Sequence, residues 1–252
     1  MELPDLPYAV FGHSLTVYKD KVRLCGGVAN GDPSNKCFQF DLFQTSPKWE
    51  KIAELPIKMY AHSSVQVLDD MWVFYGNNIY VIPQTGSLTV IPWPHGSLPR
   101  YSCAQTNGVN TIVIPNESRD VFINSDATSP QSWVKLATLP TGLTWRSCLM
   151  MGLLIYVTGG TTSWNGIGVK ESYVIDIEKR GSVKRVGDLL TGRCWHAMGV
   201  IDGAPAVMGG WDGNKNLDSI EVFDVKSETW QEILTKLHAP AHALASVSFA
   251  VN

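Results

Sequence analysis

Arginine next to tyrosine or tryptophan recurs in this 252-residue chain, in the pairs Arg100-Tyr101 and Trp145-Arg146 and in the segment Arg193-Cys194-Trp195. The planar guanidinium group offers a fork of donors that fits a carboxylate or a phosphate. Arginine, tryptophan and tyrosine also dominate the binding energy of many interfaces. The chemistry indicated is non-covalent capture of an acidic or phosphorylated peptide segment. The candidate binding residues are Arg100, Arg146, Arg193, Tyr60, Tyr101, Trp145, Trp195, Trp164 and Trp211.

Residues suited to catalysis or to metal binding do not form a pattern in the sequence. The histidines show neither His-x-His nor His-Glu-x-x-His spacing. No Gly-x-Ser-x-Gly nucleophile motif and no phosphate-binding glycine loop is present. Asp20, Asp69 and Asp202 have the spacing of turn residues, and Asp176 and Asp224 begin turns after apolar runs. We therefore expect no catalytic residue, no metal and no cofactor.

Composition and cysteine content set the class of protein. The net charge of -3 and the pI near 6.1 give no reason to expect binding to nucleic acid or to an acidic membrane. The longest apolar stretch is too short to span a bilayer, so a soluble, untargeted chain is expected. The five cysteines include no Cys-x-x-Cys pair and adjoin apolar runs, which predicts reduced, buried thiols in the cytoplasm or the nucleus. The sequon Asn116-Glu117-Ser118 is a triplet that is common by chance.

An internal repeat organises the chain that must position these side chains. A small residue after a histidine or a bulky polar residue recurs at intervals of 39 to 50 residues. These anchor residues are Ser14, Ser63, Ser102, Ser147, Ala197 and Ala243. Twelve residues after each of the first five anchors stands a matching pair, which is diglycine at Gly26-Gly27, Gly159-Gly160 and Gly209-Gly210. An offset that holds five times predicts a repeated structural unit.

Each unit reads as four short strands. Between anchor and pair, two apolar runs flank a turn such as Asp202-Gly203, which is typical of a tight hairpin. Past the pair come a variable loop, a strand that ends in an aromatic or aliphatic residue and Asp, and a strand beginning near Trp49, Trp93, Trp133 or Trp230. Four strands in a unit of this length indicate a blade of an all-β propeller. Four of the histidines, His13, His62, His196 and His242, fall at the anchors, so we expect them to hydrogen-bond a neighbouring blade.

These features together resemble the Kelch-repeat family. The resemblance is carried by Gly12-His13-Ser14 and Ala61-His62-Ser63, the diglycines, the aromatic-Asp pairs and the downstream tryptophans, and it covers nearly the whole chain. It implies a Kelch-type propeller similar to the substrate-recognition domain of Kelch-like adaptors of cullin-RING ubiquitin ligases. The second and third units lack the diglycine and the fourth lacks the tryptophan, so these blades are expected to be less regular.

The repeat boundaries define a single propeller over residues 1–252. We place five complete repeats at 13–61, 62–100, 101–145, 146–195 and 196–241, with a partial repeat at 242–252 that supplies a sixth inner strand, His242 to Phe249. The ring then has five blades, or six with one incomplete. The six-bladed alternative, which we favour, would require about 35 further residues upstream of Met1.

In a propeller, the loops between successive blades open on one face. The candidate arginines and aromatic residues lie in these loops and in the loops after the diglycines, so they should gather around the central mouth. The family resemblance implies that this face holds short acidic peptides. An equally weighted alternative is that each arginine bonds the carbonyls of its own junction. Two other functions stay open: an isomerase-like or lyase-like enzyme acting on a small anionic or sugar-acid ligand in the mouth, and an actin-associated or structural scaffold.

Overall fold

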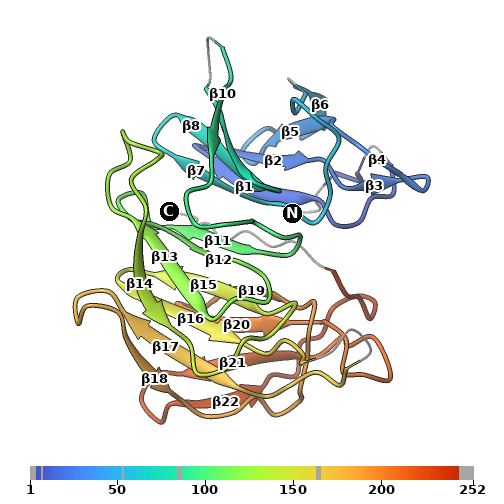
Figure 1. Cartoon of the computed structure of the whole chain (residues 1–252). Coiled ribbons are helices and arrows are strands. Elements are labelled where there is room, and N and C mark those ends of the chain that lie inside the picture. Colours follow the sequence, from blue (N-terminus) through green and yellow to red (C-terminus); the bar gives the residue numbers. More distant parts are fainter. Residues whose placement is uncertain (1–3, 7, 53, 84–86, 163–165, 244–252) are drawn as a thin grey trace.

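A computed structural model of the chain describes residues 4–6, 8–52, 54–83, 87–162 and 166–243. In these residues the chain forms strands and no α-helix, and the strands make five antiparallel sheets of four strands each. Figure 1 shows the sheets following one another about a common axis, as the blades of a propeller do. The prediction of an all-β propeller with five complete four-stranded repeats is therefore confirmed.

The blades follow the sequence order, and within each the strand nearest the axis comes first. Blade 1 contains β1 (Ser14–Tyr18), β2 (Lys21–Cys25), β5 (Cys37–Asp41) and β6 (Glu50–Lys51), and its loop carries the hairpin β3 (Val28–Ala29) and β4 (Asp32–Pro33). Blade 2 contains β7 (Ser63–Val67), β8 (Asp70–Tyr75), β9 (Asn78–Ile82) and β10 (Thr89–Pro92). Blade 3 contains β11 (Cys103–Thr106), β12 (Thr111–Ile114), β13 (Asp120–Asn124) and β14 (Val134–Thr138). Blade 4 contains β15 (Ser147–Met151), β16 (Leu154–Thr158), β17 (Ser172–Asp176) and β18 (Ser182–Arg185). Blade 5 contains β19 (Ala197–Ile201), β20 (Ala204–Met208), β21 (Ile220–Asp224) and β22 (Thr229–Glu232).

Local sequence explains the hairpins within each blade. In blade 5, Asp202 and Gly203 join β19 to β20 with φ angles of 49° and 77°. A two-residue hairpin turn with positive φ at both positions matches the right-handed twist of the strands, and Asp-Gly is one of the pairs that adopt it. Blades 2 and 3, which lack the diglycine, still form all four strands, so the expected irregularity is limited to a register shift at Val121/Phe122.

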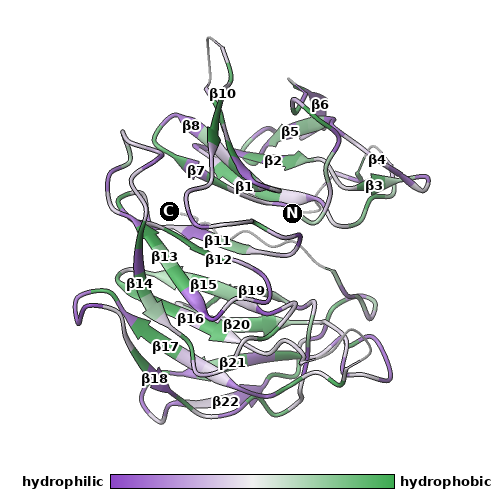
Figure 2. Ribbon diagram, viewed as in Figure 1, coloured by the Kyte–Doolittle hydropathy of each residue, from purple (hydrophilic) through white to green (hydrophobic). Residues whose placement is uncertain are grey.

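Apolar side chains between successive blades form the core. The inner strands lie side by side in the order β1, β7, β11, β15 and β19. A buried cluster fills each junction between these blades, and Figure 2 shows the matching hydrophobic colour along β16 and β20 with hydrophilic colour in many connecting loops. A further cluster with Val22 and Phe40 lies on the face of blade 1 opposite to Cys25 and Cys37, because side chains alternate along a strand.

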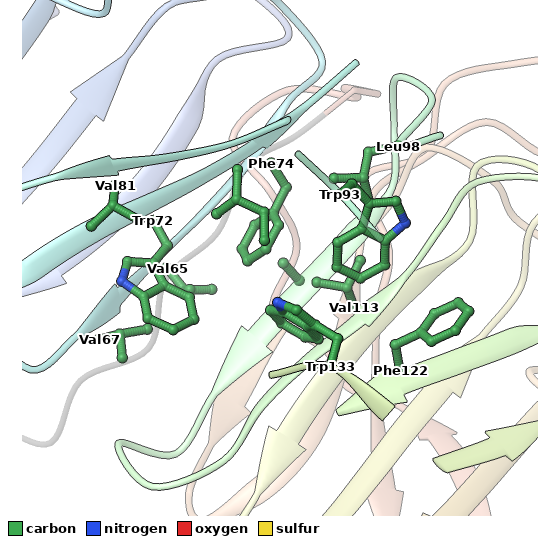
Figure 3. Close-up of a cluster of buried hydrophobic side chains, with 12 residues drawn as sticks. Val65, Val67, Trp72, Phe74, Val81, Trp93, Leu98, Val113, Phe122 and Trp133 are labelled. Carbon is green, nitrogen blue, oxygen red and sulfur yellow. The ribbon is translucent and has the colours of Figure 1, made fainter. Parts of the chain in front are cut away.

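Tryptophans next to the outer strands contact the neighbouring blade. Trp133 of blade 3 contacts Trp72 and Phe74 of blade 2 edge to face, with ring centroids 6.4 Å and 5.7 Å apart. Trp93 of blade 2 contacts Trp133 at 5.0 Å. Figure 3 shows these four side chains gathered in one buried cluster. Such edge contacts contribute beyond the buried area alone, so they fix how blades 2 and 3 meet.

The structure corrects the register of two anchors. Cys103 pairs with Ile114 as Ser14 pairs with Cys25 and Ser147 with Thr158, so Cys103 is the structural anchor of blade 3. Ser102 lies one residue too early, and its hydroxyl donates to Pro99 O and accepts from Asn116 N. Ala243 has a φ of 53°, close to that of Ala61, which stands two residues before the anchor of blade 2. The predicted sixth inner strand beyond Ala243 lies outside the described residues.

Two predictions about covalent state also change. Cys25 is bonded to Cys37 and Cys103 to Cys148, so the expectation of reduced thiols is wrong for four of the five cysteines. The sequence could not show this, because each pair is brought together only by strand pairing or by blade packing. Asn116 is buried and its side-chain oxygen accepts a bond from Trp145 N, so the sequon is not accessible in the folded chain. Among the described residues, no helix is long and apolar enough to cross a membrane.

Candidate functional site

Each blade begins with a residue in the left-handed backbone region, two positions before its inner strand. We call these the junction residues: Gly12, Ala61, Tyr101, Trp145 and Trp195, with φ angles from 53° to 64°. Backbone hydrogen bonds link several of them around the ring, from Ala61 N to Gly12 O, from Tyr101 N to Ala61 O and from Trp195 N to Trp145 O. The repeated left-handed turn carries the chain from the outer edge of one blade to the axis of the next.

Three successive junction residues are large aromatic side chains. The left-handed region is unfavourable for a bulky L-residue, and blades 1 and 2 use glycine and alanine there. The Trp145 and Trp195 rings lie 4.0 Å apart between centroids, and Tyr101 lies 6.4 Å from each. The exposed His242 continues the row at 5.4 Å from Trp195, and Trp211 lies 6.4 Å from His242. We call these five residues the aromatic arc.

The arc borders a central cavity of about 170 Å³ on the propeller axis. The cavity is lined by the junction residues and the first residues of all five inner strands, many of them small or hydroxylated, such as Ser14, Ser63 and Ser147. None of its lining residues among the described part of the chain is Asp or Glu. An acid-base pair of the kind that the enzyme alternative requires is therefore not found there. The described residues also contain no cluster of three potential metal ligands.

Arg100 supplies an exposed cation at the rim of this mouth. Its guanidinium group lies over the Tyr60 ring at 4.1 Å from the centroid and donates to the Tyr60 hydroxyl. No carboxylate of the described residues forms an ion pair with it. The ring orients the cation without neutralising its charge. Tyr60, Arg100 and Tyr101 thus form one continuous patch beside the cavity.

The other two predicted arginines bond their own junctions. The Arg193 side chain is fully buried, forms an ion pair with Glu221, and donates to Gly209 O, Ser219 O and the Ser219 hydroxyl. Arg146 is 6% exposed and donates to Leu143 O and Ser118 O, and burial lowers its pKa to about 10. Arg146 still borders the cavity, whereas Arg193 does not. The bonds of Arg146 and Arg193 agree with the alternative stated in the sequence analysis, in which an arginine bonds the carbonyls of its own junction.

The three arginines diverge because they stand at different places around the left-handed turn. Arg100 comes one residue before the junction residue Tyr101, Arg146 one residue after Trp145, and Arg193 two residues before Trp195. Only the first of these positions places the side chain in solvent. The sequence pattern treats the three arginines as equivalent, because each lies within two residues of an aromatic residue. Trp164, the remaining candidate, lies outside the described residues.

Two anchor histidines, His62 and His196, connect neighbouring blades. His62 Nε2 lies 2.8 Å from the Ser14 hydroxyl, and His196 Nε2 lies 2.8 Å from the Thr158 hydroxyl. Burial lowers the pKa of His62 to about 3 and that of His13 to about 4, and it lowers the pKa of His196 well below its ordinary value. The prediction of a structural role is confirmed for His62 and His196. All three are neutral at pH 7, so they add no charge to the cavity wall.

Comparisons with known proteins agree with this geometry. Residues 193–233 match the Kelch motif. An F-box/kelch-repeat protein of Arabidopsis thaliana is 30% identical over 99 residues, which are 39% of this chain and 25% of that protein. Human Kelch-like protein 35 is 32% identical over 110 residues, covering 42% of this chain and 18% of the relative. The chain thus matches a quarter or less of the length of these relatives.

A solved structure described as YjhT superposes over 96% of this chain and 88% of its own with a TM-score of 0.80. At 12% identity this likeness shows the fold alone. The blades and their central mouth define the chain as a β-propeller. The Kelch motif in blade 5 and the similarity to Kelch-repeat proteins support a propeller of the Kelch-repeat type.

Proposed function

We propose that this propeller is a protein-interaction module that captures a short acidic or phosphorylated peptide segment on the face bearing the aromatic arc. The observation that carries the proposal is the placement of three aromatic residues at left-handed junction positions around the mouth. The propeller turns equally well through Gly12 and Ala61, so the ring does not require these side chains. Aromatic residues around a concave mouth are typical of interaction hot spots.

The acidic preference rests on Arg100. Its exposed guanidinium group bonds the side chains of Tyr60 and Tyr75, and no carboxylate of the described residues pairs with its charge. A carboxylate or phosphate can bind this fork while neighbouring peptide residues lie on Tyr101 and Trp195. Arg146 and Arg193 would contribute through the shape of the loops and not through contact with the anion.

We extend the proposal to a role as substrate receptor of a cullin-RING ubiquitin ligase. Support comes from relatives whose names describe F-box/kelch-repeat and Kelch-like proteins. In this arrangement the propeller holds the substrate, and segments outside this chain contact the ligase. A cytoplasmic or nuclear location belongs to the same proposal.

Selection of peptides on the immobilised propeller, followed by titration of synthetic copies, tests the proposed capture. We expect the selected peptides to contain Asp or Glu, and we expect Arg100→Ala to weaken their binding by about tenfold. Arg185→Ala is the matched control, since Arg185 is exposed on the outer strand β18 and pairs with Asp188. Selected peptides without acidic residues, or equal affinity for the Arg100 variant, would reject the anion role. Arg146→Ala is unsuitable here, because its loss leaves the Leu143 and Ser118 carbonyls without their donor.

A further inference from the structure

The cysteines of this chain fall into environments of different accessibility. Cys25 and Cys37 form a disulfide in which each residue is 1% exposed, within the cluster between blades 1 and 2. The free Cys194 is also fully buried, and burial raises the pKa of its thiol to about 11. Cys103 and Cys148 form the second disulfide, and both line the central cavity. Cys103 is half-buried, whereas the other three bonded cysteines are at most 3% exposed, so Cys103 is the bonded cysteine most open to solvent.

The second disulfide lies between blades 3 and 4, next to the aromatic arc. Its Cα atoms are 6.0 Å apart on β11 and β15, which is within the usual range. At this junction Trp145 N donates to the Asn116 side chain, whereas Tyr101 N and Trp195 N donate to the preceding junction residue. The disulfide therefore connects β11 and β15 at the junction where Trp145 N donates to a side chain and not to the preceding junction residue. Tyr101 and Trp145 stand two and three residues before the bonded cysteines.

We propose that Cys103–Cys148 is a thiol–disulfide exchange site for a low-molecular-weight thiol of the glutathione class, reached through the central cavity. A thiolate attacks Cys103 Sγ, forms a mixed disulfide with it and releases Cys148 as a thiolate, which takes a proton from water. A second thiolate then attacks the sulfur of the bound small thiol. The two small thiols leave together as their oxidised disulfide. Cys103 is released as a thiolate, which takes a proton from water. Two electrons pass from two small thiols to the protein in the complete cycle.

The order of attack follows from access. Exchange requires the attacking thiolate to reach a sulfur atom along the disulfide axis. Cys148 is 3% exposed, and Cys25 and Cys37 are enclosed by Met59, Met71 and Tyr80. Cys103 is therefore the sulfur that accepts the small thiol. Opening the bond frees blades 3 and 4 from their covalent link beside Tyr101 and Trp145.

Differential alkylation of the native protein in glutathione buffers tests the proposal without any peptide ligand, so its outcome is independent of the proposed function. We expect reduced glutathione to expose Cys103 and Cys148 to alkylation at least about tenfold faster than Cys25 and Cys37. Cys194 should stay unlabelled until denaturant is added. Mass spectrometry should find glutathione on Cys103 at intermediate redox ratios.

Two variants identify the attacked sulfur. Cys148→Ser should trap glutathione on Cys103, and Cys103→Ser should carry several-fold less glutathione on Cys148. The double variant Cys25→Ser/Cys37→Ser is the control and should leave exchange at Cys103 unchanged. The proposal is overturned if both disulfides resist native reduction, if both open at the same rate, or if Cys103 and Cys148 are alkylated throughout in oxidised glutathione. The experiment on the unmodified chain decides the question even if a variant fails to fold.

Discussion

Trp145 and Trp195 begin consecutive blades, and their rings lie 4.0 Å apart at an interplanar angle of 31°. Their backbones are both left-handed, with φ angles of 56° and 53°, and a hydrogen bond runs from Trp195 N to Trp145 O. The left-handed backbone positions and the tilted, closely packed rings therefore belong to one feature of the mouth. Residues held in such backbone regions cluster at binding sites, where the surrounding structure maintains them.

Replacing one of these rings should separate binding from folding. Trp195→Gly is expected to change the free energy of unfolding by less than about 1 kcal/mol, because relief of the left-handed backbone offsets the lost ring contacts. Affinity for peptides selected on the native protein should fall at least about tenfold. Denaturant unfolding and peptide titration measure the two effects. Trp230→Ala is the contrast: Trp230 is 3% exposed in the core between blades 4 and 5, and its loss should cost about 3–5 kcal/mol.

The ion pair of Arg193 and Glu221 should be a determinant of stability. Both side chains are fully buried, and the Glu221 carboxylate also accepts from Leu190 N and Thr191 N. Arg193→Met leaves that carboxylate buried without its cation, at an expected cost of about 3–5 kcal/mol in urea unfolding. Arg185→Met breaks an exposed pair with Asp188 and should cost less than about 1 kcal/mol. Similar losses in the two variants would contradict the structural role given to Arg193.

Two glycines with the same backbone angle separate conformational strain from crowding. Gly152 and Gly159 both have a φ of 59°, but a Cβ at Gly152 would meet nothing within 4 Å. A Cβ at Gly159 would lie 2.3 Å from Arg193 O and 2.7 Å from His196 Cε1. Gly152→Ala should therefore cost about 1–2 kcal/mol from the left-handed backbone alone. Gly159→Ala should cost at least about 2 kcal/mol more in the same unfolding experiment, because the blade junction must move. Equal costs would mean that the close approach has no energetic consequence.

Stability should fall as the pH drops below about 6.5, the ordinary pKa of histidine in the unfolded chain. Burial lowers the pKa of His13 to about 4 and that of His62 to about 3 in the folded state. The unfolded chain therefore binds protons that the folded chain does not, and folding loses about 1.4 kcal/mol per pH unit for each such histidine. The loss should continue down to about pH 4 for His13 and about pH 3 for His62.

Urea unfolding at a series of pH values measures this slope. His62→Gln should reduce the dependence of the unfolding free energy on pH by about 1.4 kcal/mol per pH unit between about pH 6.5 and about pH 3. The exposed His238 is the control residue, and His238→Gln should keep the slope of the native protein. A slope that is unchanged in the His62 variant would show that this histidine is protonated in the folded chain.

Local patterns in the sequence were sufficient to predict the four-stranded blades. The Asp202-Gly203 turn, the alternating apolar strands and the spaced tryptophans each act over a few residues or recur in every unit. The structural role of His62 could be predicted in the same way, because a histidine at a repeated position serves a repeated contact. The anchor of blade 3 was misplaced by one residue, since Ser102 resembles the other anchors in type while Cys103 shares their place in the sheet.

The sequence by itself determined the propeller and the number of complete blades, because the hydrophobic pattern and turn chemistry repeat in every unit. Only the tertiary structure decided which arginine is available. A shift of one residue relative to the left-handed junction residue separates Arg100, which lies in solvent, from Arg193, which lies in the core. The disulfide between Cys103 and Cys148 likewise depends on two inner strands meeting at the axis, which no local pattern specifies.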